Sequence, residues 1–436
     1  MIGRPTSLHA MTSQYRRRLV DDELDELFPH LAAIAIEGPR SVGKSATAAR
    51  RSTSAILLDQ PDQLTLLDAD PSRLDQLPPP LLIDEWQRLP RSWDLVRRSV
   101  DANPAGGRFL LTGSAAPLTA PAHSGAGRIV RMRMRPMSLA ERDLPERPTV
   151  SLRALLSGQR PAITGTSSLT LSDYTEEILA SGFPALRGLP ERARRAQLDS
   201  YLARLADVDF EEQGHRLNRP ATMQAWLQAY AAATATTASY NTILDAATPG
   251  DSNKPAQSTT AVYRDVLTRL WMLDPLPGWL PTTNQLQRLA QRPKHHLADP
   301  ALAARLLGAT AEGLLRNEPL GRPRPSDGLL LGQLFESLVA LSVRVYAQHA
   351  EATCHHLRTQ DGSHEIDVLV EGNDRRVVAI ETKLAARVED SDVQHLAWLA
   401  NRLGTQLADA VVITTGTDAY RRRDGIAVVP AALLGP

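Results

Sequence analysis

Residues 38–45 of the chain read Gly38-Pro39-Arg40-Ser41-Val42-Gly43-Lys44-Ser45, which matches the phosphate-binding loop pattern G-x-x-x-x-G-K-[ST] in full. An apolar run, Leu31 to Ile36, precedes this loop and predicts a buried strand, and Ala46 to Arg50 after it predict the first turns of a helix. A strand, this loop and a helix in that order are the context in which the pattern binds phosphate. We therefore expect a P-loop nucleotide-binding fold.

The residue types in the loop suit a nucleotide. Gly38 and Gly43 allow a tight turn whose backbone N–H groups point inward at a helix amino terminus, where the helix dipole also favours an anion. We expect Lys44 to reach the β- and γ-phosphates of ATP and the Ser45 hydroxyl to be a ligand of Mg²⁺. The residues predicted to line the ATP site are Gly38, Pro39, Arg40, Ser41, Val42, Gly43, Lys44 and Ser45.

A second nucleotide motif follows three prolines at positions 78–80, where Leu81-Leu82-Ile83-Asp84-Glu85 predicts a buried strand that ends in two acids. In such a motif the first acid holds Mg²⁺ and the second polarises the water that attacks the γ-phosphate. We assign Asp84 to the metal and Glu85 to catalysis. The alternative, an acidic strand end that caps the next helix, is less consistent with a complete phosphate loop upstream.

Two further polar positions are candidates for contact with the γ-phosphate. The run Arg108 to Ser114 predicts a buried strand ending in small polar residues, and Thr112 or Ser114 could sense the phosphate there. An ordinary strand-ending turn explains the same residues equally well. Arg128 opens a basic stretch in which arginine and apolar residues alternate from Val130 to Arg135. This pattern is typical of a strand with a solvated charged face, and Arg128 is the candidate for an arginine that reaches phosphate.

Strands that alternate with helices, with a site at the carboxyl ends of the strands, predict a parallel α/β sheet. The length of 436 residues predicts about three domains, and we place their boundaries at 1–145, 146–315 and 316–436. Apolar content of 42% and charged content of 22% are those of a globular protein, while a net charge of zero gives no overall attraction to nucleic acid.

A single cysteine, Cys354, excludes an intramolecular disulfide framework and indicates a reducing compartment. The stretch Met1 to Thr6 lacks the apolar core of a signal peptide, and no run approaches the ~20 apolar residues that span a bilayer. We expect a cytoplasmic protein without membrane contact.

The carboxyl-terminal third carries a possible second metal site. A helical pattern from Leu331 to Ala347 includes Glu336, and the strand and helix patterns from there on follow the order α-β-β-β-α-β. Glu381 and Lys383 share one face of a strand, with Thr382 on the other, and Asp367 lies across from them if the two strands pair through the polar turn 371–374.

Converging carboxylates bind hard divalent cations such as Mg²⁺, and a lysine beside the metal can orient or deprotonate water. We therefore assign Glu336, Asp367 and Glu381 as candidate metal ligands and Lys383 as a candidate catalytic residue. A Glu–Lys pair on the strand surface of a non-catalytic scaffold is the alternative.

The sequence resembles two known groups. The phosphate loop, Leu82-Ile83-Asp84-Glu85-Trp86-Gln87-Arg88-Leu89-Pro90, Leu111-Thr112-Gly113-Ser114 and Met137-Ser138-Leu139-Ala140-Glu141 look like successive motifs of a bacterial and archaeal family of AAA-type ATPases that carry a carboxyl-terminal region of unknown function. The stretches 180–186 and 292–300 resemble the second half of the same family. The strand order and the acid, gap, acid-x-lysine motif resemble the restriction-endonuclease-like superfamily, which implies an α/β nuclease-like domain.

The middle third predicts helices, with Met223, Trp226, Leu227 and Tyr230 at helical spacing. Helices at 241–247 and 259–271, a turn at Pro249-Gly250-Asp251 and a possible wing strand at 272–276 would form a winged helix able to read DNA. Its charges are sparse, so a packing module is the alternative.

Two functional hypotheses follow. The first is a Mg²⁺-dependent ATPase coupled to a nuclease-like domain that acts on nucleic acid or binds it. The second is an ATP-driven switch whose inactive nuclease-like domain binds a protein partner or DNA. A homo-oligomer is compatible with both hypotheses.

Overall fold

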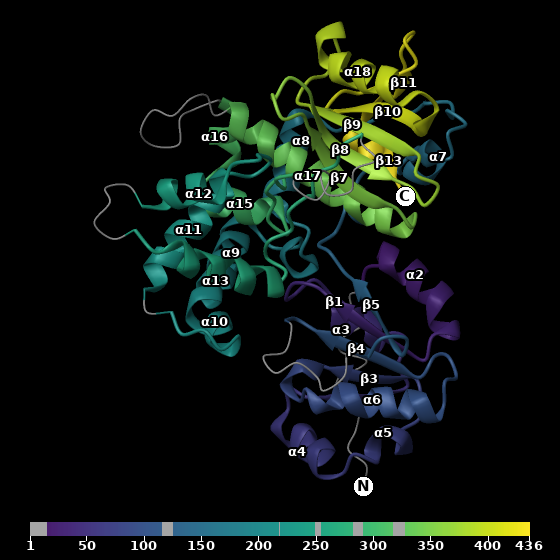
Figure 1. Cartoon of the computed structure of the whole chain (residues 1–436), viewed down its shortest axis with the longest axis vertical. Helices are drawn as coiled ribbons and strands as arrows, with labels where there is room; N and C mark the ends of the chain where they lie inside the picture. The colour runs from purple at the N-terminus through teal and green to yellow at the C-terminus, as the bar shows by residue number, and fades with distance from the viewer. Residues whose placement is uncertain (1–14, 116–124, 218, 249–253, 282–290, 317–327) are drawn as a thin grey trace.

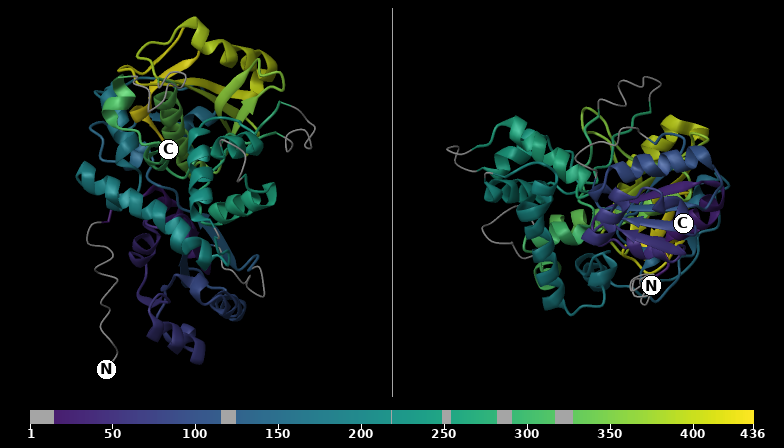
Figure 2. Two further views of the ribbon diagram at one scale, coloured as in Figure 1. Left: turned by 90° about the vertical axis from the view of Figure 1, so that its left-hand side faces the viewer. Right: turned by 90° about the horizontal axis from the view of Figure 1, so that it is seen from below.

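The computed structural model of the chain describes residues 15–115, 125–217, 219–248, 254–281, 291–316 and 328–436. Figure 1 shows two sheets at opposite ends of the molecule and a group of helices to one side. The amino-terminal part of the chain builds one sheet and the carboxyl-terminal part builds the other. Seen from below, the helical group lies beside the stacked sheets (Figure 2).

The first sheet confirms the predicted parallel α/β arrangement. Within the described residues it has five strands in the order β2-β3-β4-β1-β5, and every neighbouring pair is parallel. The strands are β1 Ala33–Glu37, β2 Ser54–Leu57, β3 Leu81–Asp84, β4 Phe109–Gly113 and β5 Ile129–Arg133. The helices of this part are α2 Leu19–Leu27, α3 Lys44–Ala49, α4 Pro61–Ala69, α5 Arg73–Gln76 and α6 Arg91–Ala102. Strand β4 separates β1, which leads into the phosphate loop, from the acidic strand β3.

The middle region is helical, as the sequence predicts. Its helices are α7 Leu152–Leu156, α8 Leu171–Ala180, α9 Glu191–Arg204, a π-helical turn Leu205–Asp209, α10 Phe210–Glu212, α11 Pro220–Ala232, α12 Tyr240–Ala247, α13 Gln257–Arg269, α15 Pro300–Leu306 and α16 Ala311–Arg316. The predicted helices at 241–247 and 259–271 correspond to α12 and α13. The turn predicted at 249–251 lies outside the described residues.

The segment 272–276, predicted to be a wing strand, forms no regular strand, and its role as a wing stays a prediction. Leu273 and Leu276 instead make isolated antiparallel bridges to Leu297 and Lys294, so the segment belongs to a pair of extended chains, 272–281 and 291–299. We call these two chains the bridging segments. The first of them also pairs with the edge of the second sheet, where Gly278 forms a parallel bridge with His356. Long-range pairing therefore sets the conformation here.

The second sheet is mixed. Its strands are β7 Thr353–Arg358, β8 Glu365–Glu371, β9 Val377–Lys383, β10 Leu407–Thr414, β11 Tyr420–Arg421 and β12 Ala427–Pro430, in the order β11-β12-β10-β9-β8-β7. Strands β7, β8 and β9 are antiparallel neighbours, and β10 runs parallel to both β9 and β12. With α17 Gly328–His349 and α18 Gln394–Leu403, the chain follows the predicted order α-β-β-β-α-β. Membership of the restriction-endonuclease-like superfamily stays a prediction.

Part of the segment 143–172 lies beside the second sheet. Strand β6, Val150–Ser151, pairs in parallel with β13, Leu434–Gly435, near the end of the chain. Thr166 forms a further bridge with Asp418. Residues of the predicted middle domain, 146–315, therefore pair with the last part of the chain.

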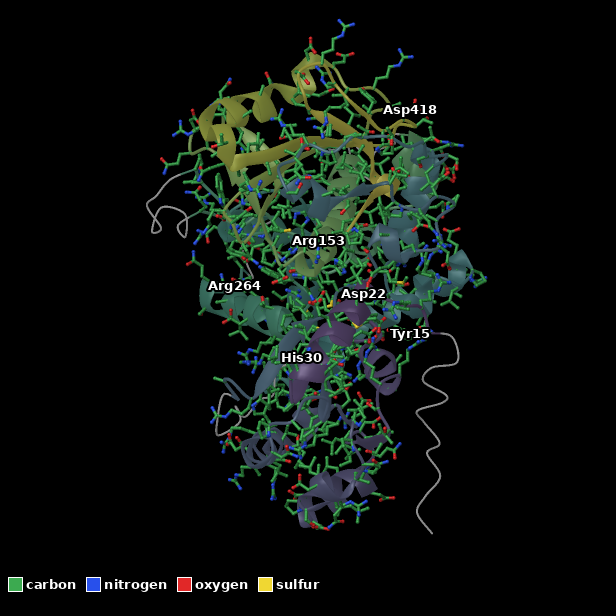
Figure 3. The ribbon with its side chains drawn as sticks, turned by 90° about the vertical axis from the view of Figure 1, so that its right-hand side faces the viewer. Tyr15, Asp22, His30, Arg153, Arg264 and Asp418 are labelled. Atoms are coloured by element: carbon green, nitrogen blue, oxygen red, sulfur yellow. The ribbon has the colours of Figure 1, made fainter. Side chains whose placement is uncertain are left out.

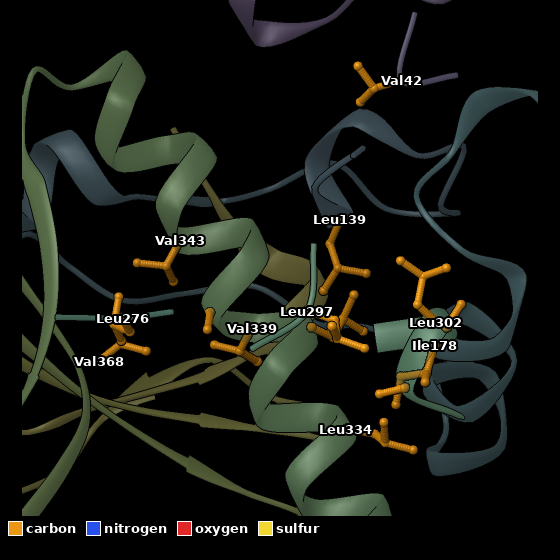
Figure 4. Close-up of a cluster of buried hydrophobic side chains, with 14 of the residues drawn as sticks. Val42, Leu139, Ile178, Leu276, Leu297, Leu302, Leu334, Val339, Val343 and Val368 are labelled. Atoms are coloured by element: carbon orange, nitrogen blue, oxygen red, sulfur yellow. The ribbon is translucent and has the colours of Figure 1, made fainter. Parts of the chain in front are cut away.

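One hydrophobic core runs through all three parts of the chain. It includes Val42 of the phosphate loop, Leu302 of α15, Val339 of α17 and Val368 of β8, all of which are fully or almost fully buried. Figure 4 shows these side chains along α17 and toward the phosphate loop. Figure 3 shows helix α2, marked by Asp22, between the two sheets, where it contacts α17.

Helix α17 is the only helix in the described ranges that is long and apolar enough to cross a membrane, over Leu329–His349. In the structure 67% of its most apolar window is buried against other elements, among them α2, α8 and α15. The sequence shows no uninterrupted apolar run of this length here, because Glu336 and Arg344 lie within Leu329–His349. Burial on most sides explains its composition as that of a core helix.

Candidate functional site

The phosphate loop joins β1 to α3, and its glycines allow its conformation. A Cβ atom added to Gly38 would lie 2.1 Å from the Met134 carbonyl oxygen, and Gly43 has a φ of 106°. The Lys44 side chain is buried, and its Nζ donates to the carbonyl oxygens of Gly38 at 2.8 Å and Pro39 at 2.7 Å. Burial lowers the pKa of Lys44 to about 8. A nucleotide phosphate would replace these two carbonyls as the partner of the ammonium.

Asp84 lies beside the loop, at the end of β3. Ser45 Oγ donates to Asp84 Oδ1 at 2.7 Å, and Thr112 Oγ1, from the end of β4, donates to the same oxygen. Burial raises the pKa of Asp84. The predicted metal pair, Ser45 and Asp84, is thus in direct contact, and its oxygen donors are of the type that Mg²⁺ prefers.

Glu85 follows Asp84 with a φ of 53°, in the left-handed region that few residues other than glycine adopt. Its Oε1 accepts a hydrogen bond from Ser114 Oγ at 3.0 Å, and its Oε2 accepts one from Gln87 Nε2. The two polar residues proposed as phosphate sensors therefore each contact one acid: Thr112 contacts Asp84, and Ser114 contacts Glu85. Gln87 was not identified from the sequence, because only the turn after β3 brings it back to Glu85.

Arg40 takes a different direction from the rest of the loop. Its guanidinium pairs with Glu212 of α10 and lies 3.4 Å from Asp209 Oδ1 in the π-helical turn. Burial raises the pKa of Asp209, and Arg40 opposes that shift. The phosphate loop is thus tied directly to the middle helices.

The assignment of Arg128 to phosphate is wrong. Arg128 precedes β5, whose first residue Ile129 pairs with Ala33, the first residue of β1. The phosphate loop begins after the last residue of β1, whereas Arg128 lies at the amino-terminal ends of the strands. At ~3.3 Å per residue, the length of β1 separates Arg128 from the loop by about 15 Å. Its Nε pairs with Asp101 at 2.7 Å. The alternation of arginines predicted the strand correctly but could not give its direction in the sheet.

A second cluster of charges lies at the second sheet and brings together all four residues predicted there. Its acids are Glu336 on α17, Asp367 and Glu365 on β8, and Glu381 on β9. Lys383 Nζ lies 3.6 Å from Glu381 Oε2. The residue at its centre is one that the sequence did not suggest as functional, Lys294, from the second bridging segment. Its Nζ lies 2.8 Å from Glu336 Oε1, 2.8 Å from Glu365 Oε1 and 3.1 Å from Asp367 Oδ1.

Burial and neighbouring charge shift the pKa values in this cluster in different directions. Burial and the Asp367 charge raise the pKa of Glu336 to about 8 and that of Glu381 well above its ordinary value. Burial would also raise the pKa of Asp367, but the Lys294 ammonium and Thr382 lower it. Burial opposes a charge on Lys294, but the three carboxylates raise its pKa well above the ordinary value.

The expected geometry of β8 and β9 needs one correction. Thr382, predicted to face away from Asp367, donates both its backbone N–H and its hydroxyl to Asp367 Oδ2, each at 2.9 Å. The regular register of the two strands stops at Val368 and Ile380, and Asp367 lies beyond it. Across the described part of the chain, no group of three or more His, Cys, Asp or Glu side chains is arranged to hold a metal ion. The three acids predicted to bind Mg²⁺ are close together, but two of them bind a lysine.

A third buried charge group joins the two sites. Asp274, in the first bridging segment, is 3.1 Å from Arg133, 2.9 Å from Arg135 and 2.6 Å from Arg344. Arg133 ends β5, next to β1, and Arg344 lies on α17 two turns beyond Glu336. Burial would raise the pKa of Asp274, but the three guanidinium groups hold it far below its ordinary value.

Comparisons with known proteins agree with the amino-terminal site. Residues 31–142 match a family described as an AAA domain. Residues 171–313 match a domain of unknown function, DUF8612, and residues 331–434 match another, DUF4143. The phosphate loop, the parallel sheet and the first match together support an ATP-binding domain of the P-loop ATPase type.

The relatives found do not carry an activity in their names. The chain is 26% identical over 406 residues to an uncharacterized protein of Mycobacterium tuberculosis. The match covers 91% of this chain and 80% of that protein. An uncharacterized protein of Mycobacterium bovis matches to the same extent. Among solved structures, the Aeropyrum pernix ORC2 protein in its ADPNP and ADP complexes covers 76% of this chain and 98% of its own, at 13% identity and a TM-score of 0.28. This last likeness is too low to bear on the fold.

Proposed function

We propose that the chain is a Mg²⁺-dependent ATPase that acts as a switch, and that ATP binding and hydrolysis alter the contacts between the amino-terminal sheet and the rest of the chain. The observation that carries the proposal is the convergence of Ser45, Asp84 and Thr112 at one side of the phosphate loop, with Glu85 next to them. Hydroxyl and carboxylate oxygens placed in this way fit a magnesium ion shared with a nucleotide.

Each residue has a distinct role in this proposal. Lys44 exchanges the Gly38 and Pro39 carbonyls for the β- and γ-phosphates. Ser45 and Asp84 hold the magnesium ion, which neutralises charge on the phosphates when it is bound. Glu85 accepts a hydrogen bond from the attacking water, and Ser114 and Gln87 fix the position of its carboxylate.

Hydrolysis and nucleotide binding are tested separately in two variants. We expect Lys44→Ala to lose nucleotide binding, measured with a fluorescent ATP analogue, and with it Mg²⁺-dependent phosphate release. Glu85→Gln should bind ATP with little change but release phosphate at least about 100-fold more slowly. The exposed acid Glu26 supplies a matched control, Glu26→Gln, which should behave as the parent. Unchanged hydrolysis in Glu85→Gln would contradict the proposal.

The contacts of the ATP site favour a switch. Arg40 links the loop to Asp209 and Glu212, and Asp274 links β5 to α17. Because both links start next to β1, a change in the loop reaches the middle helices and the second sheet through packed side chains. The partner that the switch would control is a protein, DNA or a second copy of the chain.

The other candidate is an ATP-gated nuclease that uses Lys383 with Mg²⁺ on Glu336, Asp367 and Glu381. The proximity of these four residues supports it. The position of Lys294 among the acids counts against it, and the same acids cannot hold both cations in this arrangement. We therefore prefer the switch with a nuclease-like scaffold that does not cut.

A further inference from the structure

Lys294 occupies the centre of the carboxylate cluster on the second sheet. Its side chain has no solvent exposure, whereas those of Glu336, Glu365 and Asp367 are 12%, 32% and 13% exposed. An ammonium has three N–H donors, and here three carboxylate oxygens from two different elements surround it. The lysine is thus fully satisfied by this cluster.

The distances are those of an ammonium site. The three contacts of 2.8, 2.8 and 3.1 Å are ordinary for N⁺–H···O⁻ bonds. A magnesium ion would need oxygens at about 2.0–2.1 Å in octahedral geometry. It would also have to share Glu336 and Asp367 with a positive charge that is already in place and that repels it.

The backbone holds Lys294 in this position. Its N–H donates to the Leu276 carbonyl at 2.9 Å, and its carbonyl accepts from the Leu276 N–H at 2.8 Å. The neighbouring segment is fixed to the edge strand β7, where Trp279 N–H donates to the His356 carbonyl at 2.7 Å and His356 Nε2 lies 2.9 Å from the Arg292 carbonyl. These bonds on both bridging segments leave the lysine little freedom to withdraw.

We propose that Lys294 is the resident cation of this site, that it occupies the place a divalent metal would take among Glu336, Glu365 and Asp367, and that the site therefore binds no divalent cation in the native protein. The lysine fastens the second bridging segment to α17 and β8. Its removal leaves three unpaired carboxylates, which form a cation site that the native chain lacks. This inference deepens the proposal of a nuclease-like unit that does not cut, and it is independent of ATP hydrolysis.

The test measures Mn²⁺ binding to the full chain without nucleotide, by the loss of the free Mn²⁺ signal in electron paramagnetic resonance. All proteins carry Asp84→Asn, so that the phosphate-loop site contributes no metal. We expect the Asp84→Asn protein, which keeps Lys294, to bind no more Mn²⁺ than the same protein with Asp367→Asn added. Addition of Lys294→Ala should create about one Mn²⁺ site per chain, and Asp367→Asn should abolish it.

Two results would overturn the inference: Mn²⁺ bound by the protein that keeps Lys294 and lost with Asp367→Asn, or a folded Lys294→Ala protein that gains no Mn²⁺. Circular dichroism checks folding, and Lys294→Met, which keeps the side-chain volume without the charge, replaces Lys294→Ala if that variant does not fold. If neither folds, the comparison of the Lys294 protein with Asp367→Asn decides alone. Phosphate release, measured separately with Asp84 intact, reports on the ATPase, so failure of one proposal is distinguishable from failure of the other.

Discussion

At the scale of single residues, Gly38 is the tightest position of the phosphate loop. A Cβ there would meet the Met134 backbone oxygen at 2.1 Å, and backbone cannot give way as a flexible side chain can. We predict that Gly38→Ala lowers the free energy of unfolding by about 1–3 kcal/mol and weakens ATP binding. The control is Gly188→Ala, where an added Cβ meets no atom within 4 Å. Urea unfolding should place the control within about 0.5 kcal/mol of the parent. Equal stability of the two variants would show that the loop moves freely away from Met134.

Thr112 carries the second residue-scale prediction. Its hydroxyl donates to Asp84, and it is 1% exposed, so Thr112→Val removes the bond with little change in shape. A hydrogen bond to a charged group contributes about 1.5–3 kcal/mol, so phosphate release should slow by about 10- to 150-fold. Thr175→Val, in which the lost hydroxyl bonds only within its own helix, is the matched control. A rate equal to that of the control would exclude a role for Thr112 at the site.

The sequence allowed most of the ATP site to be predicted, because its chemistry lies in local motifs. Lys44, Ser45, Asp84 and Glu85 are each fixed by neighbours in the chain. Lys294 could not be found in this way, since its acidic partners Glu336 and Asp367 lie 42 and 73 residues away. The sequence offers one local feature that could have drawn attention to Lys294. It follows Pro293 in the stretch 292–300, which resembles a family motif.

At the scale of elements, the phosphate loop and helix α10 are linked through Arg40. We predict that Arg40→Ala speeds backbone hydrogen exchange in the π-helical turn Leu205–Asp209 and in α10, because Asp209 and Glu212 lose one of the two arginines, Arg40 and Arg204, that pair with both acids. In the parent, ATP should change exchange in the same residues, and this response should be lost in the variant. Arg195→Ala, which breaks an exposed pair with Glu191 in α9, is the control. Exchange that is unaffected by both Arg40→Ala and ATP would contradict a coupling role.

Elements were predicted well where their pattern is long and apolar, as in α17 and the strands of both sheets. The failures concern pairing between distant segments. The residues 272–276 have the composition of a strand, but their partners come from 294–297, and no local pattern specifies such partners. Arg128 shows the same limit, since the direction of β5 in the sheet determines whether Arg128 lies at the amino-terminal or the carboxyl-terminal ends of the strands.

At the scale of the whole molecule, Asp274 joins the amino-terminal sheet to α17. Asp274→Asn leaves Arg133, Arg135 and Arg344 buried without their carboxylate and should lower the free energy of unfolding by about 3–5 kcal/mol at pH 7. Because the folded-state pKa of Asp274 is lowered, its contribution is present above the ordinary carboxyl pKa of ~3.9 and is lost as the pH falls below it.

Urea unfolding from pH 7 to pH 3 checks both parts of this prediction. The difference between the parent and Asp274→Asn should shrink below about pH 4. Asp68→Asn, which breaks an exposed pair with Arg91, should change stability by less than about 1 kcal/mol throughout. A difference between parent and Asp274→Asn that stays constant down to pH 3 would show that the carboxylate charge is not what joins the parts.

The first measurement to make is a single assay of the full chain with Mg²⁺, ATP and single- and double-stranded DNA and RNA. We predict that ATP is hydrolysed, that Lys44→Ala abolishes this hydrolysis, and that every nucleic acid remains intact. Mg²⁺-dependent cleavage by the parent that disappears in Lys383→Ala and requires Lys44 would contradict the switch, because the second sheet would then carry an ATP-gated nuclease.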